Sequence, residues 1–209
     1  MSIYDKASLV LIPSGTKTSK VYSQKPTNGD GDFTFSRSTA ATRVNASGNI
    51  EKETGNLFTY SNDFSQWTAG AHTRTSGYSG YDGSNNAWLV EKTTTTNSYI
   101  FSLTISVSGV WTYSVYAKAG TLGGLVFYTA ASGNATFNIE DGLVVSGSNT
   151  SIESVGNGWY RCTQFGVGSI TQTRLKATDK TGADVQGTIY IQDAQLEQGL
   201  VARDYIETT

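Results

Sequence analysis

The stretch that decides the fold is Tyr99–Val107, YIFSLTISV, which is followed after Ser108-Gly109 by residues 111–119, WTYSVYAKA. In the first stretch, large apolar residues alternate mostly with serine and threonine. A period of two is typical of a β-strand with one buried face. The second stretch repeats the period, with its buried phase at Trp111, Tyr113, Val115 and Ala117. We therefore predict two strands joined in a hairpin through a turn at Ser108-Gly109.

Further strands are predicted on both sides of this pair. Residues 123–130, GGLVFYTA, and residues 188–196, TIYIQDAQL, each read as one strand. Residues 135–145 read as a hairpin around Asp141-Gly142, because both positions of a tight hairpin turn must tolerate positive φ. No segment has apolar residues at helical spacing over three turns. The pattern predicts an all-β fold, an antiparallel β-sandwich or barrel.

Residues 154–162, SVGNGWYRC, combine a turn signal with two large aromatic residues and the single cysteine of the chain. We predict that Asn157-Gly158 forms a turn and that Trp159 and Tyr160 point to opposite faces of the next strand. Arg161 then needs either solvent exposure or an acidic partner. Cys162 is expected to be a small buried residue, and one cysteine excludes an internal disulfide.

The first fifty residues differ from the rest. Residues 15–32 are polar, weakly patterned and loop-like. Residues 1–50 carry six Lys/Arg against three Asp/Glu, whereas residues 51–209 carry nine against fourteen. We predict an extended N-terminal anchoring arm over 1–50, which becomes ordered on an acidic neighbour or on another copy, and a β-sandwich domain over 51–209. The alternatives are that residues 1–50 form a disordered tail and that the difference in charge between the two parts arises by chance.

Several classes of protein are disfavoured by composition. A formal net charge of −2 does not suggest a nucleic-acid-binding protein. No stretch approaches the ~20 apolar residues of a membrane helix, so membrane insertion is not expected. The N-terminus lacks a basic region followed by an apolar run, which predicts synthesis in a cytoplasm without a signal peptide.

Catalytic and metal motifs are weak. His72 is the only histidine, and no G-x-S-x-G motif accompanies it. One histidine and one cysteine argue against a zinc site. Residues 28–33, NGDGDF, begin like a calcium loop, but Phe33 and Thr39 stand where glycine and glutamate are needed, so a turn is expected. The body has fourteen acidic residues, and no pair of them can be selected as glycosidase carboxylates. We predict that the protein is not an enzyme.

The aromatic residues could stack on sugar rings. Trp111 falls on a buried phase, whereas Trp67 and Trp88 lie in polar, turn-rich surroundings and are the better candidates for exposure. They are therefore the predicted carbohydrate-binding residues. Packing in the core or at a sheet edge is the alternative for both.

Six segments occur in a characteristic order, namely residues 33–51, 56–68, 111–120, 135–147, 155–162 and 189–209. The set begins with FTFSRSTAATRVNASGNIE and NLFTYSNDFSQWT and closes with IYIQDAQLEQGLVARDYIETT. Together they resemble a family of tailed-bacteriophage virion proteins with a jelly-roll sandwich like that of carbohydrate-binding modules. The resemblance extends from about residue 33 to the C-terminus, and its specificity lies in the order of the segments.

The resemblance implies a virion localisation and a non-enzymatic structural role, as a capsid decoration, head fibre or tail component. The implied partners are other capsid or tail proteins and further copies of the chain, for example in a trimer. Arg37 and Arg43 of the arm are the expected partner contacts. Related calcium-binding jelly rolls imply Asp193 as a ligand of a structural calcium ion, with a turn or edge role as the alternative; no other cofactor is expected. The alternative function is recognition of host surface glycans, and a polysaccharide hydrolase is the weakest hypothesis.

Overall fold

A computed structural model describes residues 6–17, 20–28, 30–34, 42–44, 50–52, 55–101, 105–129 and 131–209. The chain divides into two compact units, Met1–Thr54 and Gly55–Thr209, here called unit 1 and unit 2. The predicted boundary after residue 50 falls inside a short strand, Ile50–Lys52. No helix in the described part of the chain is long and apolar enough to cross a membrane.

Unit 1 contains strands where we expected a polar loop. Strands β1 (Val10–Lys17), β2 (Lys20–Lys25) and β3 (Phe33–Thr34) form an antiparallel sheet in that order. Strands β4 (Thr42–Val44) and β5 (Ile50–Lys52) form a separate hairpin. The loop prediction for residues 15–32 is therefore wrong over 15–17 and 20–25, because backbone pairing overrides weak side-chain patterning.

The calcium-like residues of unit 1 form a turn, as expected. The Asp32 carboxylate accepts hydrogen bonds from the backbone N–H and the hydroxyl of Ser23, at 2.8 and 3.1 Å. The Asn28 amide donates to Asp30 at 2.6 Å. These acidic side chains hold the loop between β2 and β3 closed.

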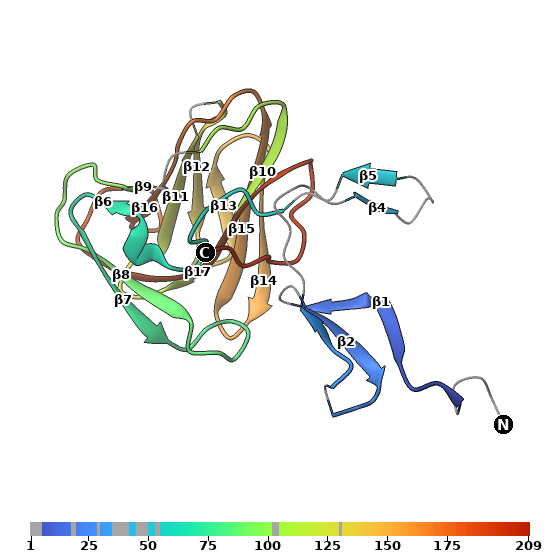
Figure 1. Ribbon diagram of the computed structural model, residues 1–209. Helices are drawn as coiled ribbons and strands as arrows, with labels where there is room; N and C mark the ends of the chain where they lie inside the picture. Colours follow the sequence, from blue (N-terminus) through green and yellow to red (C-terminus); the bar gives the residue numbers. More distant parts are fainter. Residues whose placement is uncertain are drawn as a thin grey trace. The chain divides into compact units, whose positions relative to one another are not determined.

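Unit 2 is a sandwich of two antiparallel six-stranded sheets (Figure 1). The all-β prediction is confirmed; the jelly-roll connectivity stays a prediction. The first sheet has the order β14-β15-β10-β17-β8-β7, with bounds Thr150–Gly156, Trp159–Val167, Val110–Ala119, Gly187–Gln198, Ala87–Lys92 and His72–Tyr78. The second has the order β13-β12-β11-β16-β9-β6, with bounds Leu143–Ser146, Gly133–Asn138, Gly124–Thr129, Thr173–Thr178, Ile100–Phe101 and Thr68–Ala69. A 3-10 turn, η1 (Phe64–Gln66), precedes β6.

The hairpin predicted through Ser108-Gly109 is wrong. Strand β9 belongs to the second sheet, where it pairs with β16 and β6, whereas β10 belongs to the first sheet and pairs with β15 and β17. Between them, Val107 forms an isolated bridge with Ile170. The chain therefore crosses between the sheets at Ser108-Gly109. Both strands bury one face in the core between the two sheets. A period of two therefore fits a crossover between the sheets as well as it fits a hairpin within one sheet.

Of the other two predicted turns, Asn157-Gly158 forms as expected, whereas the tight turn expected at Asp141-Gly142 does not, because only Gly142 has a positive φ. Asn157 and Gly158 both have positive φ, at 53° and 78°, and join β14 to β15 in an antiparallel hairpin. Strands β12 and β13 also pair, but their connection is longer than two residues, because pairing stops at Asn138 and Leu143. The Asn138 side chain closes that loop by accepting from the N–H groups of Glu140 and Asp141 at 3.1 and 2.9 Å.

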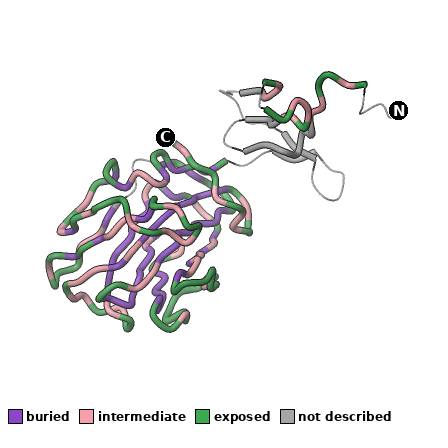
Figure 2. Tube along the Cα trace, turned by 90° about the horizontal axis from the view of Figure 1, so that it is seen from below, coloured by how far each residue is buried: buried purple, intermediate pink, exposed green. Residues whose placement is uncertain are grey.

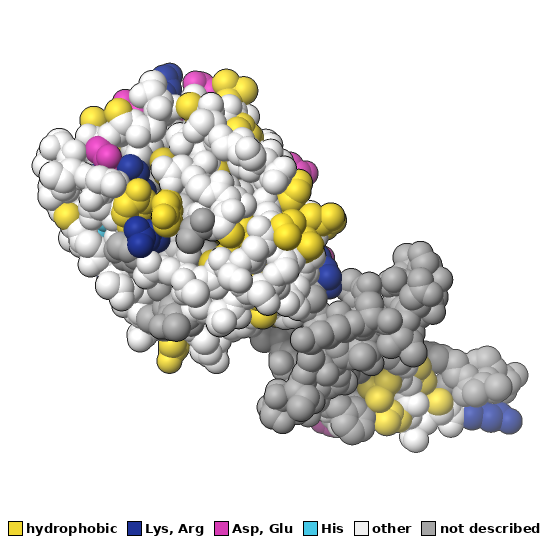
Figure 3. Space-filling view, turned by 90° about the horizontal axis from the view of Figure 1, so that it is seen from above, with side chains coloured by type: hydrophobic (Ala, Val, Ile, Leu, Met, Phe, Trp, Pro, Cys, Tyr) yellow, Lys and Arg dark blue, Asp and Glu magenta, His cyan; other side chains and the backbone are white. Residues whose placement is uncertain are grey.

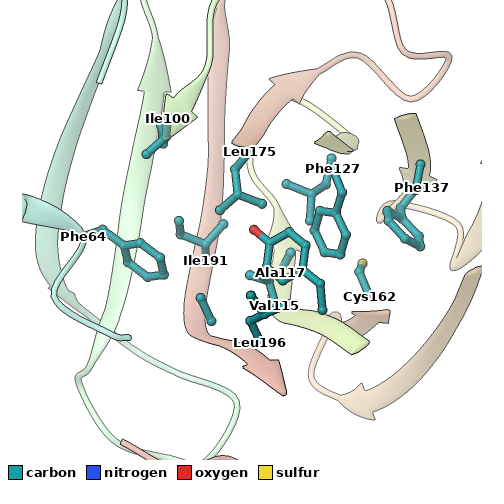
Figure 4. Packing of buried hydrophobic residues seen from close by; sticks show 14 of the residues in the cluster. Phe64, Ile100, Val115, Ala117, Phe127, Phe137, Cys162, Leu175, Ile191 and Leu196 are labelled. Atoms are coloured by element: carbon teal, nitrogen blue, oxygen red, sulfur yellow. The ribbon is translucent and has the colours of Figure 1, made fainter. Parts of the chain in front are cut away.

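The core lies between the two sheets (Figure 2). The predicted inner phase of β10 is confirmed, because Trp111, Tyr113, Val115 and Ala117 are all fully buried. Tyr113 stacks on Phe127 of the opposite sheet, with ring centroids 4.3 Å apart. Cys162 fills a small space in this core, as predicted (Figure 4).

The first and last segments of unit 2 are bound to each other. The Asn56 side-chain amide donates to the carbonyls of Ala194 and Ile206 at 2.9 and 3.0 Å, and its oxygen accepts from the N–H groups of Phe58 and Leu196. One buried side chain therefore connects the opening segment, β17 and the C-terminal segment.

Candidate functional site

The candidate site lies on the outer face of the first sheet, opposite the core. Directly paired residues share one face of a sheet. Strand register therefore places Trp159, Lys118 and Tyr190 in one row across β15, β10 and β17, and Arg161, Tyr116 and Gln192 in the next. Three aromatic residues of these rows, Tyr116, Trp159 and Tyr190, pack with Tyr78 of β7 and with Tyr81 of the loop after β7. These five residues are here called the outer tyrosine cluster.

Tyr81 fixes the loop between β7 and β8 on this face. Its ring lies parallel to that of Tyr116, with centroids 3.7 Å apart, and at an angle to Trp159. Its backbone N–H donates to the Gln192 side chain at 3.2 Å. As a result Tyr116 and Trp159 are buried although they face away from the core.

The exposed part of the cluster is formed by Tyr78 and Tyr190. Both rings are half-buried, with centroids 5.4 Å apart and planes inclined by 59°. Tyr190 pairs with Lys118 on one side and with Leu89 on the other. This arrangement leaves two partly exposed aromatic rings beside Lys118 on the outer face.

Asp193 lies next to the cluster, at an irregularity in β17. Its φ is +53°, and the pairing of β10 with β17 shifts register between Ser114 and Tyr116. The side chain is only 4% exposed and accepts a 2.8 Å hydrogen bond from the Tyr81 hydroxyl. Burial, together with the nearby Asp82 and Glu207 charges, raises the pKa of Asp193 to about 7.

This environment does not fit the predicted calcium site. Calcium takes six to eight oxygen ligands, several of them carboxylates. No group of three or more His, Cys, Asp or Glu in the described part of the chain is arranged to hold a metal ion. The Asp193 carboxylate instead faces a phenol hydroxyl, which fits the alternative role at a bulge.

Arg161 satisfies neither of the two expectations for it. Its guanidinium lies over the Tyr116 ring, 5.2 Å from the centroid, and donates to the Ser114 hydroxyl at 3.2 Å. It also donates to the backbone carbonyls of Ala202 and Arg203. Arg161 therefore holds the C-terminal segment on the sheet without a carboxylate partner.

The predicted sugar-stacking tryptophans do not form an exposed site. Trp67 is 1% exposed, with the Phe58 and Phe64 ring centroids each 5.1 Å away, and its indole N–H donates to the Tyr60 carbonyl at 3.1 Å. Trp88 is half-buried and meets Phe64 edge-on at 6.2 Å. The predicted exposure of Trp67 is thus wrong, because Phe58 and Phe64 bury its ring in the core.

The two predicted arm contacts cannot be placed in a site. Arg37 lies outside the described residues. Arg43 lies on β4, where its backbone pairs with Glu51, and its side chain is outside the described part of the structure. Their role in binding a partner stays a prediction.

His72 is buried at one end of the sandwich, in surroundings that are unlike a catalytic triad. Its Nδ1 is 3.4 Å from the Ser98 hydroxyl, and its Nε2 has no hydrogen-bond partner. Burial and the neighbouring Lys92 and Arg74 charges lower the pKa of His72 to about 4. In a triad the second nitrogen would donate to a carboxylate, whereas Nε2 of His72 has no hydrogen-bond partner, and the nearby Lys92 and Arg74 charges outweigh that of Asp184.

Lys92, one of the cations beside His72, belongs to a buried ion cluster with Asp184 and Lys176 that joins the two sheets. Lys92 of β8 is fully buried and contacts Asp184, which also accepts from Lys176 of β16 at 3.1 Å. Lys176 donates in addition to the Asn97 side chain at 3.1 Å. One carboxylate thus serves two ammonium groups.

Sequence reasoning missed the outer tyrosine cluster. Tyr116 lies on the phase of its strand opposite to the predicted buried phase of Trp111, Tyr113, Val115 and Ala117, and this was the available signal. Tyr190 is the direct neighbour of Lys118 on the same face. Tyr78 and Tyr81 stand in a Gly/Ser-rich stretch without periodicity, so only the folded loop brings them to the face.

Comparisons with known proteins give little further information. No family model and no curated protein matches the chain. Among solved structures, the enzymatically active domain of tailspike protein 4 from bacteriophage CBA120 is similar, with 12% sequence identity and a TM-score of 0.40. The match covers 68% of this chain and 21% of that chain. A likeness this low carries no argument about function.

Proposed function

We propose that the protein is a non-enzymatic structural component of a tailed-bacteriophage virion, a capsid decoration, head fibre or tail component, which displays unit 2 on the particle. The proposal rests first on the ordered segments by which the sequence resembles that family. Unit 1 would anchor the chain to other virion proteins, with Arg37 and Arg43 as contacts, and several copies would assemble.

The observation that carries the proposal is that Asn56 and Gln195, two polar residues of the characteristic segments, form hydrogen bonds within unit 2. Asn56 of the opening segment binds the backbone at Ala194 and Ile206 of the closing segment. Gln195 donates to the carbonyls of Arg203 and Asp204 and accepts from the Ile206 N–H at 2.8 Å. These polar residues are occupied in closing the module, which supports a role in a displayed framework rather than in catalysis.

The experiment is particle fractionation. We expect the full chain to co-purify with particles through density-gradient centrifugation. A variant lacking residues 1–54 should stay in the soluble fraction, with circular dichroism reporting whether unit 2 remains folded. A full chain that never associates with particles contradicts the proposal.

A second candidate function, recognition of a host surface glycan, is favoured by one observation. Tyr78 and Tyr190 present two half-exposed rings 5.4 Å apart beside Lys118. The apolar surface of such rings can pack against the apolar face of a pyranose. The site is therefore distinct from the predicted Trp67 and Trp88.

A glycan array tests this second function. We expect binding that is lost in Tyr190→Ala and kept in Tyr128→Ala, which removes a half-exposed tyrosine of the other sheet. Equal loss in both variants, or no binding above background, contradicts it.

A further inference from the structure

Lys118 differs from the other lysines of unit 2. Of the four lysines after residue 54, Lys92, Lys176 and Lys180 form ion pairs with carboxylates. Lys118 is half-buried and forms no ion pair with any residue in the described part of the chain. Charged side chains are sparse on the face that Figure 3 presents, and only 15% of all residues are charged. A cation that the fold itself does not use is therefore a candidate for contact with a ligand.

Strand register places Lys118 in a row with aromatic residues on the outer face of the first sheet. Lys118 of β10 pairs with Trp159 of β15 on one side and with Tyr190 of β17 on the other. From β14 to β7 the row consists of Gly156, Trp159, Lys118, Tyr190, Leu89 and Thr75. Lys118 is thus the one charged residue of this row.

Three exposed acidic residues lie near this row without forming an ion pair with Lys118. Glu91 lies on β8 and Glu153 on β14, and each of these strands is two positions away from β10 in the sheet. At the ordinary strand spacing their backbones are about 10 Å or more from Lys118, so their charges are largely screened there. The Asp82 carboxylate accepts from the Gln192 amide at 3.2 Å and from the Ser84 hydroxyl at 2.7 Å. A ligand in contact with this row therefore meets mainly the charge of Lys118.

The Lys118 side chain extends toward the turn between β14 and β15. A Cβ atom added to Gly158 would lie 3.5 Å from Cε and 4.0 Å from Cδ of Lys118, so the stem packs along this glycine. On the other side of Lys118, Tyr78 and Tyr190 present half-buried rings whose centroids are 5.4 Å apart. A cation and a pair of rings thus lie next to each other on one face.

We propose that this face binds an acidic glycan, with one sugar ring on Tyr78 and Tyr190 and the acidic group of an adjoining sugar at Lys118. The inference rests on the second candidate function, glycan recognition, and adds the chemical class of the glycan to it. The tyrosine rings offer apolar surface to a sugar ring and do not distinguish a neutral glycan from an acidic one. Lysine supplies that distinction as a compact point charge, which attracts a carboxylate and a sulfate alike.

Binding of the full chain to matched oligosaccharides tests the proposal. The probes share one backbone and differ in charge: a neutral form, a form with uronic acids and a sulfated form. We expect at least one acidic form to bind about fivefold more tightly than the neutral form at low salt, as a partly exposed ion pair allows. The advantage should shrink at high salt, because ions screen an exposed pair. Isothermal titration calorimetry gives the dissociation constants.

Variants of Lys118 assign the advantage to this residue. Lys118→Gln should remove it and keep the weaker binding of the neutral form, whereas Lys118→Arg should retain it. The matched control is Lys180→Gln, which removes the same charge from a lysine that already pairs with Glu140 and Asp141 at 3.6 and 3.5 Å. This control should bind all three probes like the wild type.

The outcomes separate this inference from the function on which it rests. Equal affinity of the wild type for neutral and acidic probes, with all binding lost in Tyr190→Ala, overturns the acidic class and keeps glycan recognition at the tyrosines. An acidic advantage that persists in Lys118→Gln also overturns the inference, since another group must then bind the acidic sugar. A wild-type chain that binds none of the probes overturns both.

Discussion

The hydroxyl of Tyr81 donates a 2.8 Å hydrogen bond to the carboxylate of Asp193, 112 residues away in the sequence. The bond ties the loop between β7 and β8 to the bulge of β17, and it leaves the Tyr81 ring stacked on Tyr116. Tyr81→Phe keeps the ring and removes the donor. We expect a loss of about 1–2 kcal/mol of unfolding free energy in urea denaturation, because a buried acceptor is left without its partner. Tyr78→Phe, in the half-exposed partner of Tyr190, is the control and should unfold like the wild type.

Asp193 should make unit 2 less stable as the pH rises. Its pKa is raised to about 7 in the folded protein, so the folded state holds a proton that the unfolded chain releases near pH 4. The stabilising contribution is complete below about pH 4 and is lost as the pH rises to 7. Asp193→Asn should remove this part of the pH dependence while keeping an acceptor for Tyr81. A variant with the same pH profile as the wild type would contradict the assignment.

His72 should act in the opposite direction over much of the same range. Its pKa is lowered to about 4, so the folded state disfavours a proton that the unfolded chain binds below about pH 6.5. Stability is complete above pH 6.5 and declines as the pH falls to 4. His72→Phe should remove that decline in pH-dependent thermal unfolding. Because Asp193 compensates in part, the clearest comparison is His72→Phe in an Asp193→Asn background.

Asp184 should be the most sensitive member of the buried ion cluster. Asp184→Asn leaves the fully buried Lys92 and its neighbour Lys176 without a carboxylate. An unpaired buried charge is strongly destabilising, and because Asp184 is itself partly exposed we expect a loss of about 2 kcal/mol in urea denaturation. Asp141→Asn removes an exposed partner of Lys180 at 3.5 Å and should leave stability unchanged. Equal effects in the two variants would show that the cluster is no more important than a surface ion pair.

Asn56 should control the C-terminal segment. Asn56→Ala removes hydrogen bonds to Phe58, Ala194, Leu196 and Ile206. With about 1 kcal/mol for each bond, the loss should be about 4 kcal/mol, and amide hydrogen exchange should increase over residues 199–209. Asn85→Ala, in the exposed loop after β7, is the control. Unchanged exchange in the tail would mean that other contacts hold it.

The alternation of side chains predicted β10, β11, β12 and β17 but not their partners. It predicted no strand at β7, β8, β14 or β16. In β10 it separates Trp111 and Tyr113, which are buried in the core, from Tyr116 on the outer face. It could not reveal that β9 and β10 enter different sheets, because both bury one face in the same interior. Asn157-Gly158 was predictable for a local reason, since both residues tolerate positive φ.

The site was less predictable than the fold. The polar residues around Trp67 in the sequence suggested that its side chain is exposed. In the structure, however, the rings of Phe58 and Phe64 pack against it. Asp193 was expected to bind calcium, but its partner is Tyr81, on a loop without a recognisable pattern. Contacts between segments more than one hundred residues apart depend on the topology, which a single sequence does not specify.

Cryo-electron microscopy of purified particles is the decisive test of whether this chain is a structural part of a phage particle. We expect repeated density on the particle that fits the two-sheet sandwich of unit 2, with unit 1 in contact with capsid or tail proteins. Particles that contain no such density, while the intact protein remains in the soluble fraction of the same lysate, would contradict it.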